Sequence, residues 1–126
     1  MADMPGGVPE TWSGSTPEYY IYWAMFRLGY KDRFDYQVSY AGGRQLKGGT
    51  VIDFFIPELN MAIFVQSIRY HYASFEQTIA DSMIRAMLEG QGIKVIYIDE
   101  ADALSNPTFY LLEATKGQDH SLMATR

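Results

Sequence analysis

TVIDFFI (residues 50–56) and MAIFVQSI (61–68), joined by PELN (57–60), decide the fold of this chain. The two outer segments are almost wholly apolar, as strands covered on both faces are. The connection between them is short enough for a tight hairpin turn. These residues therefore predict two adjacent antiparallel strands at the centre of a sheet.

A helix and a strand are predicted upstream of this hairpin. A hydroxyl residue, Thr16, followed by Pro17 and Glu18 is typical of a helix start. Gly29 marks the end of the helix. Apolar and polar residues then alternate over residues 34–40, which predicts a half-buried strand and completes a three-strand meander. The apolar stripe of the helix consists of Ile21, Ala24, Met25 and Leu28.

Two helices and one strand are predicted downstream. Ser74 and Gln77 have capping-box spacing and open a helix that ends at Gly90. A short apolar strand over residues 94–98 follows, and Asn-Pro then opens a last helix over 107–116. The inner side of the first of these helices is expected to consist of Phe75, Ile79, Met83, Met87 and Leu88.

The order of these elements predicts an α/β domain with a mixed sheet flanked by helices, in the sequence αβββαβα. A strand that returns through a helix normally lies parallel to the strand before the helix. The domain is expected over residues 15–117, which suits a chain of 126 residues. Residues 1–14 predict an extended arm anchored by Trp12, and residues 118–126 a polar, frayed tail.

Composition excludes several classes of site. The chain has no cysteine and only two histidines, so Cys-ligated metals and His-rich metal sites are not expected, and a metal should be a hard ion held by oxygens. The net charge of -5 counts against a generic nucleic-acid binder, although local patches matter more than the sum. Without a signal-peptide pattern or an apolar run of ~18 residues, we expect a cytoplasmic protein of a bacterial or phage-infected cell, neither secreted nor membrane-bound.

Two polar side chains interrupt the central apolar strands. Asp53 lies among apolar neighbours, where a carboxylate is costly to bury unless it is paired or binds a metal. Gln66 interrupts the next strand at a similar distance from the turn, so the two can approach across the sheet and bind a metal together. The alternatives are an Asp53 that reaches water or a neighbouring amide, and a Gln66 bonded to an edge backbone group.

Three further residues are candidates for catalysis. Glu18 lies on the buried side of the first helix, although an acid there also favours the helix dipole. His71 follows the second central strand, where it suits proton transfer, although a histidine among aromatics is often structural. Asp81 lies on the flank of the second long helix, where a solvated acid is the alternative.

Basic residues flank the central strands. Arg44 and Lys47 belong to a glycine-bounded loop that could follow a phosphate backbone, and Arg69 follows the second central strand. The alternative is an ordinary solvated hairpin loop. We expect DNA as the partner if the basic residues act together.

Three stretches together resemble the very short patch repair endonucleases and related phage homing endonucleases of the PD-(D/E)xK, or restriction-endonuclease-like, superfamily. They are TPEYYIYWAMFRLGY (16–30), GGTVIDFFIPELNMAIFVQSIRYHY (48–72) and DSMIRAMLEGQGIKVIYIDEADAL (81–104). The resemblance covers residues 15–105. It implies a restriction-endonuclease-like core.

The resemblance also implies a function, namely hydrolysis of DNA phosphodiester bonds with Mg²⁺ or Mn²⁺. Asp53 matches the metal-binding strand aspartate of the family, Gln66 a polar position on the next strand, and His71 a histidine that assists proton transfer. Glu18 and Asp81 match acids in the flanking helices. The chain departs from the superfamily where a second strand acid and a lysine are usual, because it has Gln66 and Ile68 there.

These departures leave two other hypotheses open. The chain could be a catalytically degenerate nuclease fold that binds nucleic acid or protein, for instance as a phage structural component. It could also be an interaction protein, because aromatic residues are enriched at interfaces. The aromatic residues of its N-terminal region are Trp12, Tyr19, Tyr20, Tyr22 and Trp23. A homodimer is a further possibility that the sequence leaves open.

Overall fold

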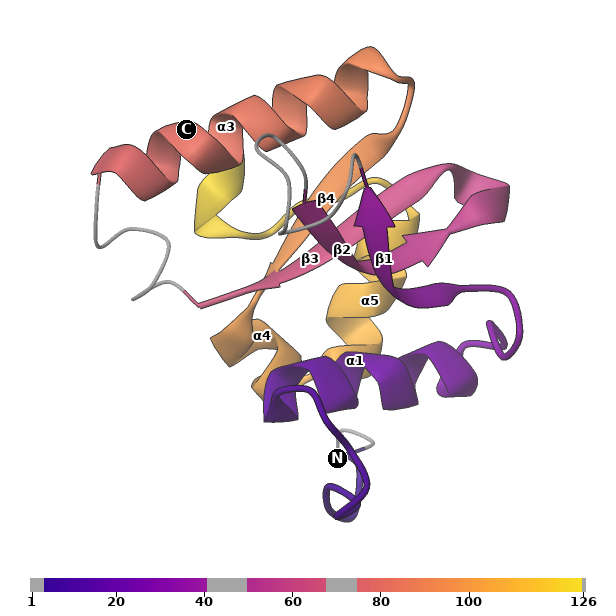
Figure 1. Cartoon of the computed structure of the whole chain (residues 1–126). Helices are drawn as coiled ribbons and strands as arrows, with labels where there is room; N and C mark the ends of the chain where they lie inside the picture. The colour runs from indigo at the N-terminus through magenta and orange to yellow at the C-terminus, as the bar shows by residue number, and fades with distance from the viewer. Residues whose placement is uncertain (1–3, 41–49, 68–74, 126) are drawn as a thin grey trace.

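Four strands form one mixed sheet in the computed structural model, which describes residues 4–40, 50–67 and 75–125. The strands are β1 (Asp35–Tyr40), β2 (Thr50–Ile56), β3 (Met61–Gln66) and β4 (Lys94–Asp99). The helices are α1 (Thr16–Arg27), α3 (Phe75–Gly90), α4 (Glu100–Ser105) and α5 (Pro107–Thr115), with short 3₁₀ turns η2 (Pro57–Leu59) and η3 (Leu122–Thr125). Figure 1 shows this arrangement.

The strands follow their order in the chain across the sheet, β1-β2-β3-β4. β1 pairs antiparallel with β2, and β2 pairs antiparallel with β3, because only the short turn η2 joins β2 to β3. β4 pairs parallel with β3, since α3 carries the chain back to the other end of the sheet. The predicted meander, crossover and mixed sheet are therefore confirmed.

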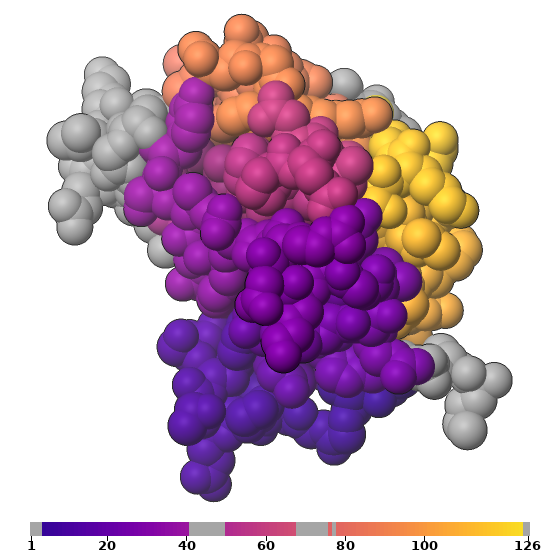
Figure 2. Space-filling view, turned by 90° about the vertical axis from the view of Figure 1, so that its right-hand side faces the viewer, coloured from indigo at the N-terminus to yellow at the C-terminus, as the bar shows by residue number. Residues whose placement is uncertain are grey.

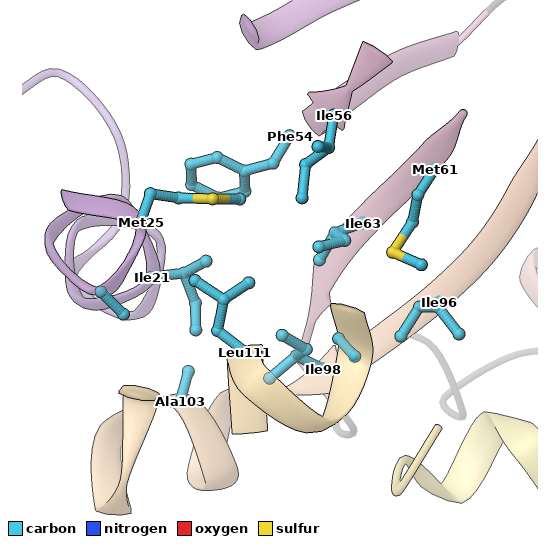
Figure 3. Packing of buried hydrophobic residues seen from close by; sticks show 12 residues of the cluster. Ile21, Met25, Phe54, Ile56, Met61, Ile63, Ile96, Ile98, Ala103 and Leu111 are labelled. Atoms are coloured by element: carbon cyan, nitrogen blue, oxygen red, sulfur yellow. The ribbon is translucent and has the colours of Figure 1, made fainter. Parts of the chain in front are cut away.

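Helices cover both faces of the sheet (Figure 1). α1, α4 and α5 lie on one face, where α1 residues such as Met25 meet Phe54 and Leu111 (Figure 3). α3 lies on the other face, where Leu88 packs with Ile52 and Val95. Two apolar clusters, one on each side, thus hold the sheet in place.

The N-cap of helix α1 lies one residue earlier than predicted. Ser15 is the N-cap, and its hydroxyl accepts a hydrogen bond from the Glu18 backbone N–H at 3.2 Å. The Glu18 carboxylate accepts the Ser15 backbone N–H at 2.9 Å, which completes a capping box. The predicted apolar stripe is confirmed, because Ile21, Ala24 and Met25 are fully buried.

Helix α3 packs on the sheet with only part of the predicted stripe, namely Met87 and Leu88. Leu88 is fully buried and Asp81 is 6% exposed, whereas Ile79 and Met83 are 43% and 67% exposed. The expectation that Ile79 and Met83 lie inside is wrong. The stripe that packs on the sheet recurs at positions 81, 84 and 88, which are three and four residues apart and therefore share one face.

The segment after Gly117 packs against β4, so the expectation that it is frayed is wrong. Ser121 and Met123 are 4% and 7% exposed. The Asp119 carboxylate accepts the backbone N–H of Tyr97 at 3.1 Å, and the Leu122 N–H donates to Asp99 at 3.0 Å. In Figure 2 these yellow C-terminal residues lie against the body of the molecule.

The N-terminal arm is anchored by Trp12, as predicted. Its ring packs on Tyr19 and Tyr22 of α1 and on Tyr36 of β1, with ring centroids 5.0 to 5.2 Å apart. Its indole N–H donates to the Ser15 carbonyl at 3.0 Å. Among the described helices, none combines the length and apolar character needed to cross a bilayer.

Candidate functional site

Asp53 lies at the point where β2 and β3 separate. The pairing of these strands runs from Ile56–Met61 to Phe54–Ile63 and stops before Asp53. The Asp53 carboxylate oxygen Oδ2 accepts the backbone N–H of Val65 at 2.9 Å, so a side chain continues the contact where the backbone ladder ends. Asp53 is half-buried, and this bond is one of the two alternatives that the sequence left open.

Side chains change faces of the sheet around Asp53. Phe54 belongs to the cluster under α1, but Ile52, two residues earlier, belongs to the cluster under α3. The neighbouring strand does the same between Tyr36 and Val38. Gln37, which lies between these two, has a left-handed backbone with φ of 53°. Such a φ is uncommon outside glycine and adds local strain beside Asp53.

Tyr36 lies between two of the predicted site acids. Burial raises its pKa to about 12, and the negative charges of Glu18 and Asp53 add to that shift. A Cβ added at Gly14 would collide with the Tyr36 hydroxyl and lie 3.2 Å from the Glu18 carboxylate, so these polar groups meet at the arm. The structure therefore brings Glu18 and Asp53 to the same neighbourhood, with a neutral phenol that the sequence did not single out.

Gln66 is the ladder partner of Asp99 on β4. Its side chain is 4% exposed, and its direct neighbour in the parallel β3–β4 ladder is Asp99, which is 5% exposed. Within the described part of the chain, Gln66 Oε1 and Asp99 Oδ1 have no hydrogen-bond partner. The other Asp99 oxygen accepts the Leu122 N–H. Sequence reasoning missed Asp99, although an acid that ends the apolar run KVIYI was visible.

Asp99 is a buried acid among acids. Burial raises its pKa, the Leu122 N–H opposes that shift, and the charges of Asp102 and Asp119 raise it further. Buried carboxylates usually have a basic partner or a metal. Among the described side chains whose charges act on Asp99, none is basic.

Asp81 lies on α3 beside β4, whereas Asp53 lies on β2. Asp81 lines a pocket of about 130 Å³ between α3 and β4, together with Arg85 and Tyr97. Burial raises the pKa of Tyr97 to about 12, with Arg85 opposing and the Asp81 charge adding to the shift. The charge of Asp53 raises the pKa of Tyr36 on β1 instead, so the two acids influence different tyrosines.

Four predicted residues lie outside the described residues: His71, Arg44, Lys47 and Arg69. Among the residues that are described, no three of His, Asp, Glu or Cys gather in the manner of a metal site. The Asp53 carboxylate and the buried amide oxygen of Gln66, which has no hydrogen-bond partner among the described residues, are nonetheless of the kind that hard cations bind. The chemistry of the donor set thus fits Mg²⁺ or Mn²⁺.

Comparison of the chain with protein-family models, with curated proteins and with solved structures found no match. The family of the chain is therefore not shown by similarity.

Proposed function

We propose that this protein is a metal-dependent DNA endonuclease or nickase with a restriction-endonuclease-like core centred on Asp53. The observation that carries the proposal is the Asp53 carboxylate at the point where β2 and β3 separate. The carboxylate is half-buried, and the Val65 backbone N–H holds it in place. That is the arrangement a metal-binding carboxylate needs.

The order and directions of the strands support the proposal. An initial helix, an antiparallel meander, a crossover helix and a fourth strand parallel to the third are the elements that the resemblance implies. β2 is antiparallel to β3 and β4, so the first half of β2 lies at the carboxyl ends of the other two. Asp53, Gln66 and Asp99 therefore approach one end of the sheet, which is where α/β proteins usually bind ligands.

Each residue has a role in the proposed reaction. Asp53 would hold Mg²⁺ or Mn²⁺ together with Gln66, and the bound ion supplies an activated water and neutralises phosphate charge. Glu18 adds negative charge near Asp53 through its place beside Tyr36. His71 would transfer a proton, and Arg44, Lys47 and Arg69 would contact phosphates.

The test is cleavage of DNA by the full chain with Mg²⁺ or Mn²⁺. Plain, nicked, mismatched and branched duplexes are incubated with the wild type, with Asp53→Asn and with Asp35→Asn as a matched control. Asp35 is an exposed acid of the neighbouring strand β1. Asp53→Asn keeps an acceptor for the Val65 N–H, so it removes charge while the fold is retained.

We expect Asp53→Asn to lower the rate by more than about 100-fold, since even outer-shell changes cost about 10–100-fold at metal sites. Asp35→Asn should cut as the wild type does. Equal cutting by Asp53→Asn, or no cutting of any substrate by the wild type, would refute the proposal. Light scattering during the assay would show whether a homodimer forms on DNA.

A second candidate is a catalytically degenerate nuclease fold that binds nucleic acid or protein. Two observations favour it: the Glu18 carboxylate is engaged in a capping box, and no three acidic or histidine groups gather among the described residues. Such a module would bind DNA, or a protein through its aromatic N-terminal region, without Mg²⁺. Labelled DNA distinguishes the two candidates when anisotropy in EDTA is followed by addition of Mg²⁺, because both bind DNA without metal but only the enzyme then cleaves it.

A further inference from the structure

Gln66 and Asp99 form a buried pair of oxygens at the ends of two parallel strands. Gln66 is the last residue of β3 and Asp99 the last of β4, and the two are direct partners in the ladder. Gln66 Oε1 and Asp99 Oδ1 each expose less than 1 Å² and have no hydrogen-bond partner in the described part of the chain. Two unpartnered acceptors on adjacent, in-register strands call for a proton or a positive group between them.

No described basic side chain supplies that group. Both charged side chains that shift the pKa of Asp99, Asp102 and Asp119, are acids. The Leu122 N–H is bound to the other oxygen, Oδ2. An ionised carboxylate in this environment is expensive to bury without a cation.

We propose that Asp99 and Gln66 form a subsite for a divalent, oxygen-preferring cation such as Mg²⁺ or Mn²⁺. Asp99 then supplies the carboxylate that the amide of Gln66 lacks. The subsite lies at the carboxyl ends of neighbouring parallel strands, where ligands of α/β sheets bind. Carboxylate and amide oxygens are the donors that these ions prefer, and water completes the shell.

The subsite deepens the proposed function, on which only its catalytic use rests. Gln66 follows Val65, whose N–H binds the Asp53 carboxylate, so Asp53, Gln66 and Asp99 lie on three adjacent strands, β2, β3 and β4. Asp53 and Asp99 would together give the ion two negative charges from strands on either side of β3. Cation binding by Asp99 itself can be tested without any DNA.

The experiment is calorimetric titration of the full chain with Mn²⁺ and with Mg²⁺. The variants are Asp99→Asn, Asp53→Asn and, as a matched control, Asp102→Asn. Asp102 is a partly buried acid of α4 that acts on the same carboxylate. Asp99→Asn retains an acceptor for the Leu122 N–H, and circular dichroism checks its fold.

We expect Asp99→Asn to weaken Mn²⁺ binding at least about tenfold, as changes at metal sites commonly do. Asp102→Asn should bind as the wild type does. If binding is lost in Asp99→Asn and kept in Asp53→Asn, the subsite stands even where no DNA is cut. Loss of Mn²⁺ binding in both variants also supports the subsite, because it would mean that Asp53 and Asp99 bind the same ion. Loss in Asp53→Asn alone, or no binding by the wild type, overturns it.

Gln66→Glu provides a second test that does not require Asp99→Asn to fold. Two adjacent carboxylates bind a divalent ion better than one. Mn²⁺ should therefore raise the thermal unfolding temperature of Gln66→Glu more than it raises that of the wild type. An equal or smaller rise overturns the subsite. The alternative to a cation is a proton on Asp99. A protonated Asp99 would give a carboxylic-acid infrared band that Asp99→Asn removes. If saturating Mn²⁺ leaves that band unchanged, the proposed cation subsite is overturned.

Discussion

The Asp53 carboxylate accepts the backbone N–H of Val65 at 2.9 Å, on the strand next to its own. In a continued β2–β3 ladder a backbone carbonyl would fill that place. The bond lets the two strands separate without leaving the Val65 N–H unsatisfied. One side chain therefore has a structural role and, in the proposed function, a catalytic one.

The structural role of Asp53 can be separated from its charge. Asp53→Ala leaves the Val65 N–H without its acceptor and should lower the free energy of unfolding by about 1–3 kcal/mol. Asp53→Asn keeps an acceptor and should cost less than about 1 kcal/mol. Urea unfolding in EDTA measures both. An Asp53→Ala variant as stable as Asp53→Asn would mean that the bond to Val65 contributes nothing in solution.

The C-terminal segment should contribute to stability through Met123. Met123 is 7% exposed and packs in the cluster under α3, so Met123→Ala should cost about 2 kcal/mol or more. Leu122 is 52% exposed, and Leu122→Ala should change stability by less than about 0.5 kcal/mol. Chemical unfolding of the two variants makes the comparison. Equal costs would show that the segment is detached from β4.

The backbone of Gln37 leads to an unusual prediction for a strand. Its φ of 53° suits glycine, so Gln37→Gly should be neutral or stabilise the fold by up to about 1 kcal/mol. Gln37→Val should destabilise it by more than about 1 kcal/mol, although valine normally favours strands. Both variants lose the Gln37 amide bond to the Tyr36 hydroxyl, so their difference reports the backbone alone. The usual order, with valine the more stable, would contradict the left-handed conformation.

Alkaline pH should unfold the protein through Tyr36 and Tyr97. Burial raises the pKa of each phenol to about 12, above about 10 in an unfolded chain. A raised pKa favours the neutral phenol in the fold, so this contribution to stability is full below pH about 10 and is lost as pH rises towards about 12. The thermal unfolding temperature should fall less steeply across that pH range in Tyr97→Phe than in the wild type. An unchanged slope would show that Tyr97 ionises as freely as in the unfolded chain.

Apolar periodicity predicted the sheet because strand pairing depends on local pattern. The alternation over 34–40 and the continuous apolar runs at 50–56 and 61–66 require strands of those lengths. The short turn η2 allows only an antiparallel pair, and the crossover helix favours a parallel fourth strand. These properties follow from neighbouring residues and chain length, so the sequence is sufficient.

The same periodicity failed for α3, and the reason is competition among faces. Ile79 and Met83 are exposed, whereas Ile84, Met87 and Leu88 pack in the cluster under α3 and Asp81 is buried. A helix with apolar residues on several sides can dock in more than one rotation, and the shape of the sheet selects among them. Composition alone gives no information on that shape.

In the candidate site, too, some features follow from the sequence and others only from the tertiary structure. The sequence by itself determined the α/β layout and singled out Asp53 and Gln66, because a polar residue inside an apolar strand needs a reason that is visible locally. Only the tertiary structure decided that Asp53 binds Val65, that Gln66 lies beside Asp99, and that the C-terminal segment closes over β4. Those relationships join residues up to 33 positions apart, and the distance between such residues depends on how whole strands and helices pack.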